Sequence, residues 1–196
     1  GLDDYQVVDL VFSPDGKKVL FWVYQAPGYQ LRIFDTVTGK LTHSYYQTTS
    51  LPSWSGDSSQ LVFISLYNGK GEIFTWNLVS NQVKPVTNSP AEKRDVTWSP
   101  DGTWLAYTTD GWNAALVRVD GSGTHLLPNP RGFYNIPIQW SPDSRYVYTL
   151  SSSNCCDPRE LWRYDTWSKT NSFVSGQPVY EIVSNQKIDI KRLLPF

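Results

Sequence analysis

Carboxylates recur along this chain at a regular position, which makes them the first candidates for chemistry. Four aspartates, Asp15, Asp57, Asp101 and Asp143, each follow a serine by two residues. Neighbouring carboxylates can perform general acid–base catalysis, but an aspartate in a tight turn also accepts hydrogen bonds from backbone N–H groups two residues further on. Because a turn explains every copy, we interpret these aspartates as structural and predict no catalytic residue.

The two cysteines, Cys155 and Cys156, are adjacent. Successive Cα atoms lie about 3.8 Å apart across a trans peptide bond, below the usual distance in a disulfide, so a bridge between them would be strained. A vicinal disulfide, a pair of loop thiols and a redox role all stay open. Since the chain has only two histidines, His43 and His125, both expected in outer strands, we predict neither a metal site nor a cofactor.

The aspartates belong to a motif that repeats together with its surroundings. Its copies are Phe12–Gly16, Trp54–Ser58, Trp98–Gly102 and Trp140–Ser144, and successive motif serines lie 42, 44 and 42 residues apart. A period in the low forties with strand-like content is typical of a β-propeller, in which each repeat forms one four-stranded blade. The predicted fold class is therefore all-β, with four recognisable blades.

The third repeat shows the expected strands most clearly. Alternation and turn residues place strands at Asp95–Trp98, Trp104–Thr108, Leu116–Asp120 and Thr124–Leu127. The third strands of the other repeats are expected at Leu31–Asp35, Ile73–Asn77 and Leu161–Asp165, each ending in Asp or Asn before a turn. The motif turns and the ends of the third strands thus recur with the same period, which supports the assignment of the repeat.

The chemistry of the motif explains its turn. Proline fixes φ at the first corner, and glycine adopts a positive φ. Serine replaces this glycine at Ser58 and Ser144, which we expect to cost some backbone strain. The aromatic residue that opens each copy is expected to pack between neighbouring blades; these residues are Phe12, Trp54, Trp98 and Trp140.

The stretch from Trp98 to Tyr107 resembles the repeats of the TolB-type β-propeller family, a variant of the WD-repeat family, and the resemblance covers about residues 5 to 178. It implies a non-catalytic scaffold that binds a protein, often on the face that bears the central channel. It also implies a bacterial envelope or other extracytoplasmic location. Similar repeats occur in the propeller domains of prolyl-oligopeptidase-like enzymes. The motif itself is a turn and names no ligand.

We interpret residues 1–196 as a single propeller domain or a segment of one, with repeats at about 5–47, 48–88, 89–130 and 131–178. Residues 179–196 would form a partial fifth blade or closing strands, with strands at Val179–Val183 and Lys187–Ile190. Because an open edge would be an aggregation hazard, we expect further blades outside this segment that complete a ring of six or seven. The alternative is a small ring of four or five blades.

A binding site is expected on one face of the propeller. The loops between second and third strands and the loops between blades emerge there, opposite the motif turns. The candidates for partner binding are Tyr29, Tyr67, Trp112, Arg131, Phe133 and Tyr134, and we expect the run Glu92–Asp95 to join them. Tyr, Trp and Arg together suit a protein-interaction surface or a platform for a sugar ring. Ordinary loop aromatics that pack over the blades are the alternative.

Three functions follow from these features. The first is a scaffold that binds a protein or envelope-associated partner, and the second is an accessory propeller that gates a hydrolase domain outside this chain. The chain has no Gly-x-Ser-x-Gly motif of a serine hydrolase, so in the second case the catalytic residues would lie in another domain of the parent protein. That domain, or the remaining blades of the ring, would then be among the partners of this chain. A lectin with repeated pockets is disfavoured because equivalent loops differ, but a single carbohydrate pocket stays open. The net charge of −1 argues against nucleic acid, and no apolar run is long enough for membrane insertion.

Overall fold

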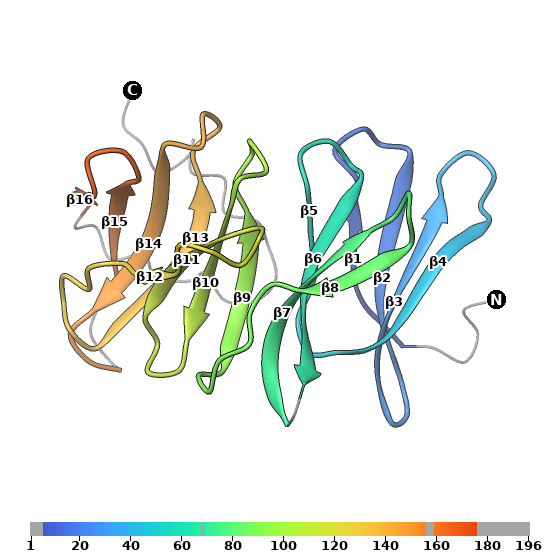
Figure 1. Ribbon diagram of the computed structural model, residues 1–196, viewed down its shortest axis with the longest axis horizontal. Helices are drawn as coiled ribbons and strands as arrows, with labels where there is room; N and C mark the ends of the chain where they lie inside the picture. The colour runs from blue at the N-terminus through green and yellow to red at the C-terminus, as the bar shows by residue number, and fades with distance from the viewer. Residues whose placement is uncertain (1–5, 68, 156–158, 176–196) are drawn as a thin grey trace.

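Four blades follow one another in sequence order, from blade 1 on the right of Figure 1 to blade 4 on the left. The computed structural model describes residues 6–67, 69–155 and 159–175. Blade 1 contains β1 (Gln6–Phe12), β2 (Lys18–Gln25), β3 (Gly28–Asp35) and β4 (Leu41–Thr48), and blade 2 contains β5 (Ser53–Trp54), β6 (Gln60–Tyr67), β7 (Lys70–Asn77) and β8 (Gln82–Pro85). Blade 3 contains β9 (Lys93–Trp98), β10 (Trp104–Thr109), β11 (Ala114–Arg118) and β12 (His125–Leu126), and blade 4 contains β13 (Tyr134–Trp140), β14 (Tyr146–Ser152), β15 (Glu160–Asp165) and β16 (Thr170–Ser175). This confirms the predicted all-β propeller architecture.

Each blade is an antiparallel sheet in which successive strands pair with one another. Blades 3 and 4 form separate four-stranded sheets, with the strand orders β12-β11-β10-β9 and β13-β14-β15-β16. Blades 1 and 2 are joined into one sheet by a single residue pair, Thr48 with Ser65. The two-residue β5 pairs only with β6 among the described strands. The blades therefore depend on packing between their faces more than on hydrogen bonds between their edges.

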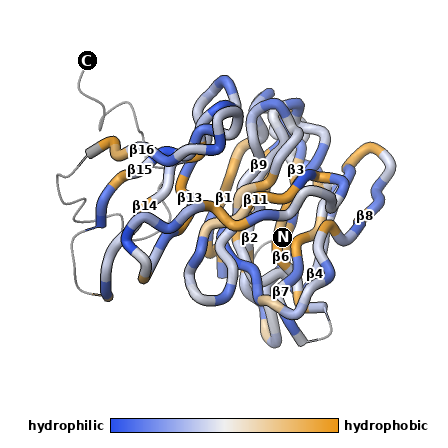
Figure 2. Tube along the Cα trace, turned by 60° about the vertical axis from the view of Figure 1, so that its left-hand side comes forward, coloured by the Kyte–Doolittle hydropathy of each residue, from blue (hydrophilic) through white to orange (hydrophobic). Residues whose placement is uncertain are grey.

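The hydrophobic core lies between the blades. One cluster joins Leu20, Leu31 and Ile33 of blade 1 to Trp54, Phe63 and Trp76 of blade 2. A second joins Val62, Ile64 and Ile73 of blade 2 to Trp98, Leu105 and Tyr107 of blade 3, and a third joins Ala106 and Leu116 to Trp140 and Val147 of blade 4. Figure 2 shows hydrophobic stretches along the strands, whereas the loops are largely hydrophilic. Burial of these apolar faces holds successive blades together.

The aromatic residues that open the motif confirm this packing in three of the four blades. Trp54, Trp98 and Trp140 are 7%, 6% and 5% exposed, and each belongs to one of the clusters between blades. The indole Nε1 of Trp54 also donates to the carbonyl oxygen of Val11 in blade 1, at 3.3 Å. Phe12 does not show this packing among the described residues: it is 58% exposed and belongs to none of the clusters, and no described blade precedes its own.

The motif turns have the predicted structural role. In all four copies the serine hydroxyl donates to the aspartate, at 2.6 Å in the first three and 2.5 Å in the fourth. Each aspartate also accepts the backbone N–H two residues further on, at 3.0 to 3.1 Å. The serine hydroxyl holds the pKa of Asp15, Asp57 and Asp143 below the ordinary value, because it stabilises the ionised carboxylate. These aspartates are therefore turn caps.

The serines that replace glycine connect neighbouring blades. Ser58 and Ser144 have φ angles of 62° and 61°, in the left-handed region that favours glycine. The Oγ of Ser58 accepts the backbone N–H of Asp15 in the preceding blade at 3.1 Å, and the Oγ of Ser144 accepts that of Asp101 at 2.9 Å. Thus the strain expected at these positions is accompanied by a hydrogen bond to the previous blade that glycine could not make.

The interface between blades 2 and 3 uses close backbone contact instead. Gly56 stands where the other three motifs have proline. A Cβ atom at this position would lie 2.7 Å from the carbonyl oxygen of Pro100 in blade 3. A side chain there would force the two turns apart, which explains why this copy of the motif departs from the others.

Some strand limits differ from the prediction. The first strand of blade 3 begins at Lys93, two residues earlier than expected, and β11 ends at Arg118 because Asp120 caps the next turn by accepting the N–H of Ser122 at 2.9 Å. The outer strand is reduced to His125–Leu126. The strands predicted at 179–183 and 187–190, and Cys156 with its candidate disulfide, lie outside the described residues.

We predict that Ser144→Ala destabilises the domain by about 1 kcal/mol, because it loses the hydrogen bond to Asp101 and keeps the positive φ. Ser144→Gly also loses the bond but relieves the strain, so its stability should lie closer to that of the wild type. Urea denaturation followed by tryptophan fluorescence would measure both. Ser168→Ala, at an exposed turn, is the matched control. An alanine variant as stable as the wild type would show that the contact between these turns contributes nothing.

Candidate functional site

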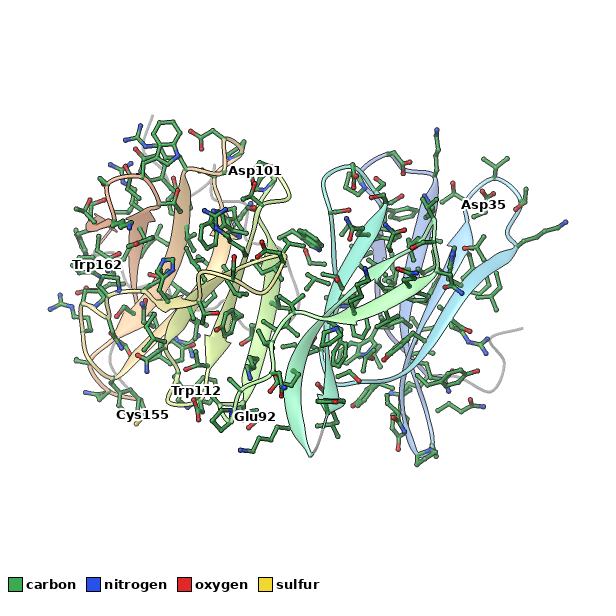
Figure 3. All side chains as sticks on the ribbon, in the orientation of Figure 1. Asp35, Glu92, Asp101, Trp112, Cys155 and Trp162 are labelled. Carbon is green, nitrogen blue, oxygen red and sulfur yellow. The ribbon has the colours of Figure 1, made fainter. Side chains whose placement is uncertain are left out.

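Loops of two kinds meet on one face of the molecule, as predicted. Figure 3 shows Glu92, Trp112 and Cys155 along the lower edge, whereas Asp35 and Asp101 lie at the upper edge with the motif turns. The lower edge also contains the β2–β3 hairpin (Figure 1). We call this edge the loop face.

A pocket of about 270 Å³ opens on the loop face between blades 3 and 4. It is lined by Trp112, Phe133, Tyr134, Ser152, Asn154, Cys155 and Arg159, and we refer to it as the Trp112 pocket. The ring centroids of Trp112 and Tyr134 are 6.0 Å apart, and the planes are tilted by 37°. Trp112 and Phe133 remain substantially exposed. The structure thus brings three of the six predicted site residues together.

The backbone positions Trp112 across the boundary between the blades. Trp112 has a φ of 59°, and its N–H donates to the carbonyl oxygen of Thr109 at 3.2 Å. Its own carbonyl oxygen accepts the N–H of Asn135 in blade 4 at 2.8 Å. Since a non-glycine residue at positive φ is strained, this conformation depends on the surrounding hydrogen bonds. These hydrogen bonds hold the backbone of Trp112 in place where blades 3 and 4 meet at the Trp112 pocket.

Two arginines border the aromatic rings. The guanidinium of Arg94 lies 5.0 Å from the centroid of Trp112, and that of Arg159 lies 5.2 Å from the centroid of Tyr134. Arg94 also pairs with Glu92 at 3.3 Å, in an exposed contact. Among the described residues, no carboxylate forms an ion pair with Arg159. Burial raises the pKa of Tyr134 above its ordinary value, so its hydroxyl stays protonated at neutral pH and can donate a hydrogen bond.

Arg131 lies outside the lining of the Trp112 pocket. Its guanidinium binds the carboxylate of Glu160 through two contacts, of which Nε to Oε2 is 2.7 Å. This pairing raises the pKa of Arg131 and lowers that of Glu160. Arg131 thus fixes the loop before β13 against β15.

The two remaining predicted residues lie in other clefts of the loop face. Tyr29 lines a cleft between blades 1 and 2, and Tyr67 lines a smaller hollow between blades 2 and 3. The structure therefore distributes five of the six residues over three clefts, whereas Arg131 pairs with Glu160 outside them.

The expectation that the whole run Glu92–Asp95 lies on the surface was wrong for Lys93. Its ammonium group pairs with Glu72 of blade 2 at 2.7 Å, and the two side chains are 2% and 3% exposed. Glu72 also accepts the hydroxyl of Thr87 at 2.5 Å and the N–H of Ser89 at 3.0 Å. Lys93 donates to the Oγ of Ser89 at 2.8 Å. This buried network joins β7 to β9 beneath the loop face.

Neither the acidic residues nor the histidines gather into a metal-binding cluster in the described part of the chain. It contains no group of three or more His, Cys, Asp or Glu side chains that could hold a metal ion. His43 contacts the carbonyl oxygen of Leu78 through Nε2 at 2.9 Å, and His125 contacts that of Gly123 through Nδ1 at 3.0 Å. Within the same residues, no helix has the length and apolar character needed to cross a membrane.

Comparison with known sequences identifies the family. A model of the TolB beta propeller domain matches residues 4–175. The chain belongs to this family. It is 26% identical over 148 residues to dipeptidyl-peptidase 5 of Porphyromonas gingivalis, covering 65% of this chain and 21% of that protein. It is 29% identical over 116 residues to the protein LST8 homolog of Drosophila melanogaster, covering 55% of this chain and 36% of that protein.

Solved structures share the fold. TolB from Acinetobacter baumannii superposes with a TM-score of 0.68 at 20% identity, covering 87% of this chain and 44% of that one. A prolyl endopeptidase superposes with a TM-score of 0.72 at 17% identity, covering 90% of this chain and 29% of that one. An oligogalacturonate lyase in complex with manganese gives 0.73 at 13% identity, covering 88% and 54%. The chain thus spans less than two thirds of the length of each protein named here, and these structures show the fold alone.

We predict that removing one partner of the buried ion pair, as in Lys93→Met, destabilises the domain by about 3–5 kcal/mol, because the carboxylate of Glu72 would lose its counter-charge. The double variant Glu72→Leu/Lys93→Met should be less destabilised than the sum of the two single variants. Arg94→Met, which removes an exposed pair, should cost less than about 1 kcal/mol. Urea denaturation of Glu72→Leu, Lys93→Met, the double variant and Arg94→Met would measure these free energies of unfolding. A double variant destabilised by the full sum of the two single variants would contradict the pairing.

Proposed function

We infer that this domain is a non-catalytic scaffold that binds a protein or envelope-associated partner at the Trp112 pocket. The observation that carries the proposal is the arrangement of Trp112 and Tyr134 at 6.0 Å, each with an arginine over its ring. Tryptophan, tyrosine and arginine are the residue types most enriched at the centres of protein interfaces. Phe133 adds exposed apolar area beside them.

The chemistry of the pocket favours a partner segment with an acidic group beside an apolar or aromatic side chain. The guanidinium of Arg159, which lines the pocket, can donate hydrogen bonds to such a carboxylate. The aromatic rings offer apolar surface that loses little conformational entropy on binding, because their positions are already restricted. A location outside the cytoplasm, as the family resemblance implies, belongs to the same proposal.

Trp112→Ala should weaken partner binding about tenfold to thirtyfold without changing the melting temperature, because it removes a central aromatic contact from the surface. The partner would first be trapped from the native envelope by a photo-crosslinker at position 133, then purified and titrated against each variant by calorimetry. Tyr67→Ala, an exposed tyrosine in a different cleft, is the matched control. Equal affinities for wild type, Trp112→Ala and Phe133→Ala would refute the proposed surface.

A second candidate function is an accessory propeller that controls access to a hydrolase domain of the parent protein. It is favoured by the similarity to dipeptidyl-peptidase 5 and by the shared fold with a prolyl endopeptidase. On this proposal the loop face would lie against the catalytic domain, and the Trp112 pocket would contact peptide substrates or the domain itself.

If this alternative holds, the full-length parent protein should react with a fluorophosphonate probe at a serine outside residues 1–196, because serine hydrolases carry an activated nucleophile. Mass spectrometry would locate the labelled residue, and Ser151→Ala would serve as a control within this chain. A full-length protein that neither reacts nor hydrolyses peptides would exclude the accessory role and leave the scaffold.

A further inference from the structure

The cleft between blades 1 and 2 has a chemistry unlike that of the Trp112 pocket. It has a volume of about 500 Å³, within the range of small-molecule sites. It lies where the β2–β3 hairpin and the end of β4 meet Leu66 of β6 in blade 2. Its lining includes three glutamines, two tyrosines and Thr48; the glutamines are Gln25, Gln30 and Gln47, and the tyrosines are Tyr29 and Tyr46. No described residue that lines it carries a charge. We refer to it as the glutamine cleft.

An incompletely paired amide contributes to its floor. Gln30 is 6% exposed, and its Nε2 donates to the Oε1 of Gln25 at 3.0 Å. The Oε1 of Gln30 is buried, with no hydrogen-bond partner among the described residues. Buried amide oxygens are normally satisfied, so this one is costly to the fold. The loss of stability caused by this unpaired oxygen is explained if a bound ligand donates a hydrogen bond to it.

The neighbouring backbone is held in a strained conformation. Gln47 has a φ of 68°, in the left-handed region, and its carbonyl oxygen accepts the hydroxyl of Ser65 at 2.7 Å. Non-glycine residues in this region are concentrated at functional sites, where the surroundings enforce the conformation. Here the hydrogen bond from Ser65 of blade 2 holds the end of β4 in place, so that Gln47 and Thr48 line the cleft.

An anchored aromatic stack forms one wall. Tyr29 stacks on Trp22 with centroids 4.8 Å apart and planes tilted by 27°, and Tyr24 meets Tyr29 edge-on at 5.2 Å. The indole Nε1 of Trp22 donates to the Oγ1 of Thr48 at 3.1 Å, which ties the stack to the floor. Tyr29 and Tyr46 are 38% and 57% exposed. Rigid ring faces are therefore presented beside the amides.

We propose that the glutamine cleft binds a neutral carbohydrate. A pyranose ring offers a face of C–H groups that can pack on tyrosine rings, and a rim of hydroxyls that both donate and accept hydrogen bonds. Glutamine amides and threonine hydroxyls also do both, so they complement such a rim. The uncharged lining disfavours anionic ligands, which would leave their charge unpaired. This site does not depend on the Trp112 pocket, which has arginines and lies between other blades.

Saturation-transfer NMR of the domain with D-glucose, D-galactose, D-mannose, N-acetylglucosamine and their disaccharides would identify a bound sugar, and titration would give its affinity. At least one neutral sugar should bind, and Tyr29→Ala and Gln30→Met should each weaken it by about tenfold or more. Tyr46→Ala, at an exposed position, provides a second variant if Tyr29→Ala fails to fold. Trp112→Ala is the matched control and should bind the sugar as the wild type does.

Three results would overturn the proposal. They are the absence of binding by every neutral sugar, equal binding by the wild type and folded glutamine-cleft variants, and a preference for galacturonate or glucuronate over the neutral sugars. Because Trp112→Ala affects only the protein partner and Tyr29→Ala only the sugar, failure of one function is distinguishable from failure of the other.

Discussion

Face-to-face packing of the blades is the constraint on which the rest of this structure depends. A single residue pair joins the sheets of blades 1 and 2, and blades 3 and 4 form separate sheets, so edge hydrogen bonds contribute little between blades. The apolar clusters that contain Trp54, Trp98 and Trp140 supply the contact. Such packing is non-directional, and it therefore requires polar contacts that fix how far one blade is rotated against the next.

Those polar contacts lie at both ends of the blades. At the end with the motif turns, Ser58 and Ser144 each accept an N–H from the preceding blade. At the loop face, the buried pair of Glu72 and Lys93 joins blades 2 and 3, and the carbonyl of Trp112 joins blades 3 and 4 through Asn135. The clefts between blades are thus bounded by fixed groups. Because each cleft takes its side chains from two different repeats, each acquires its own chemistry, with arginines near Trp112 and neutral amides near Tyr29.

The local and repeated features were predictable from the sequence. The hydrogen bond from Ser13 to Asp15 involves residues two apart, and its recurrence in every blade makes the turn recognisable without a structure. Loop aromatics such as Trp112 could be assigned to a face because strand alternation determines which loops share it. Contacts between blades could not be predicted in the same way. Lys93 was expected at the surface because nothing in its own repeat shows that Glu72 lies within reach.

The same limit applies to the candidate sites. Arg159 was missed because the sequence does not show that it lies beside the ring of Tyr134. Gln30 was missed because its incompletely paired amide is visible only once its surroundings are known. Ser58 and Ser144 were recognised as strained, but the N–H groups that they accept lie 43 residues away. The sequence therefore predicts which face holds function, whereas the chemistry of each cleft depends on how the blades are rotated.

The central claim is that this domain binds through the clefts of its loop face and uses its motif turns for structure alone. Hydrogen–deuterium exchange of the domain, alone and with its crosslink-identified partner, would test this most directly. The account predicts that the partner slows exchange around residues 109–113, 131–135 and 152–155, and leaves the turns at 13–18 and 99–104 unchanged. Protection confined to the motif turns, with none on the loop face, would contradict it.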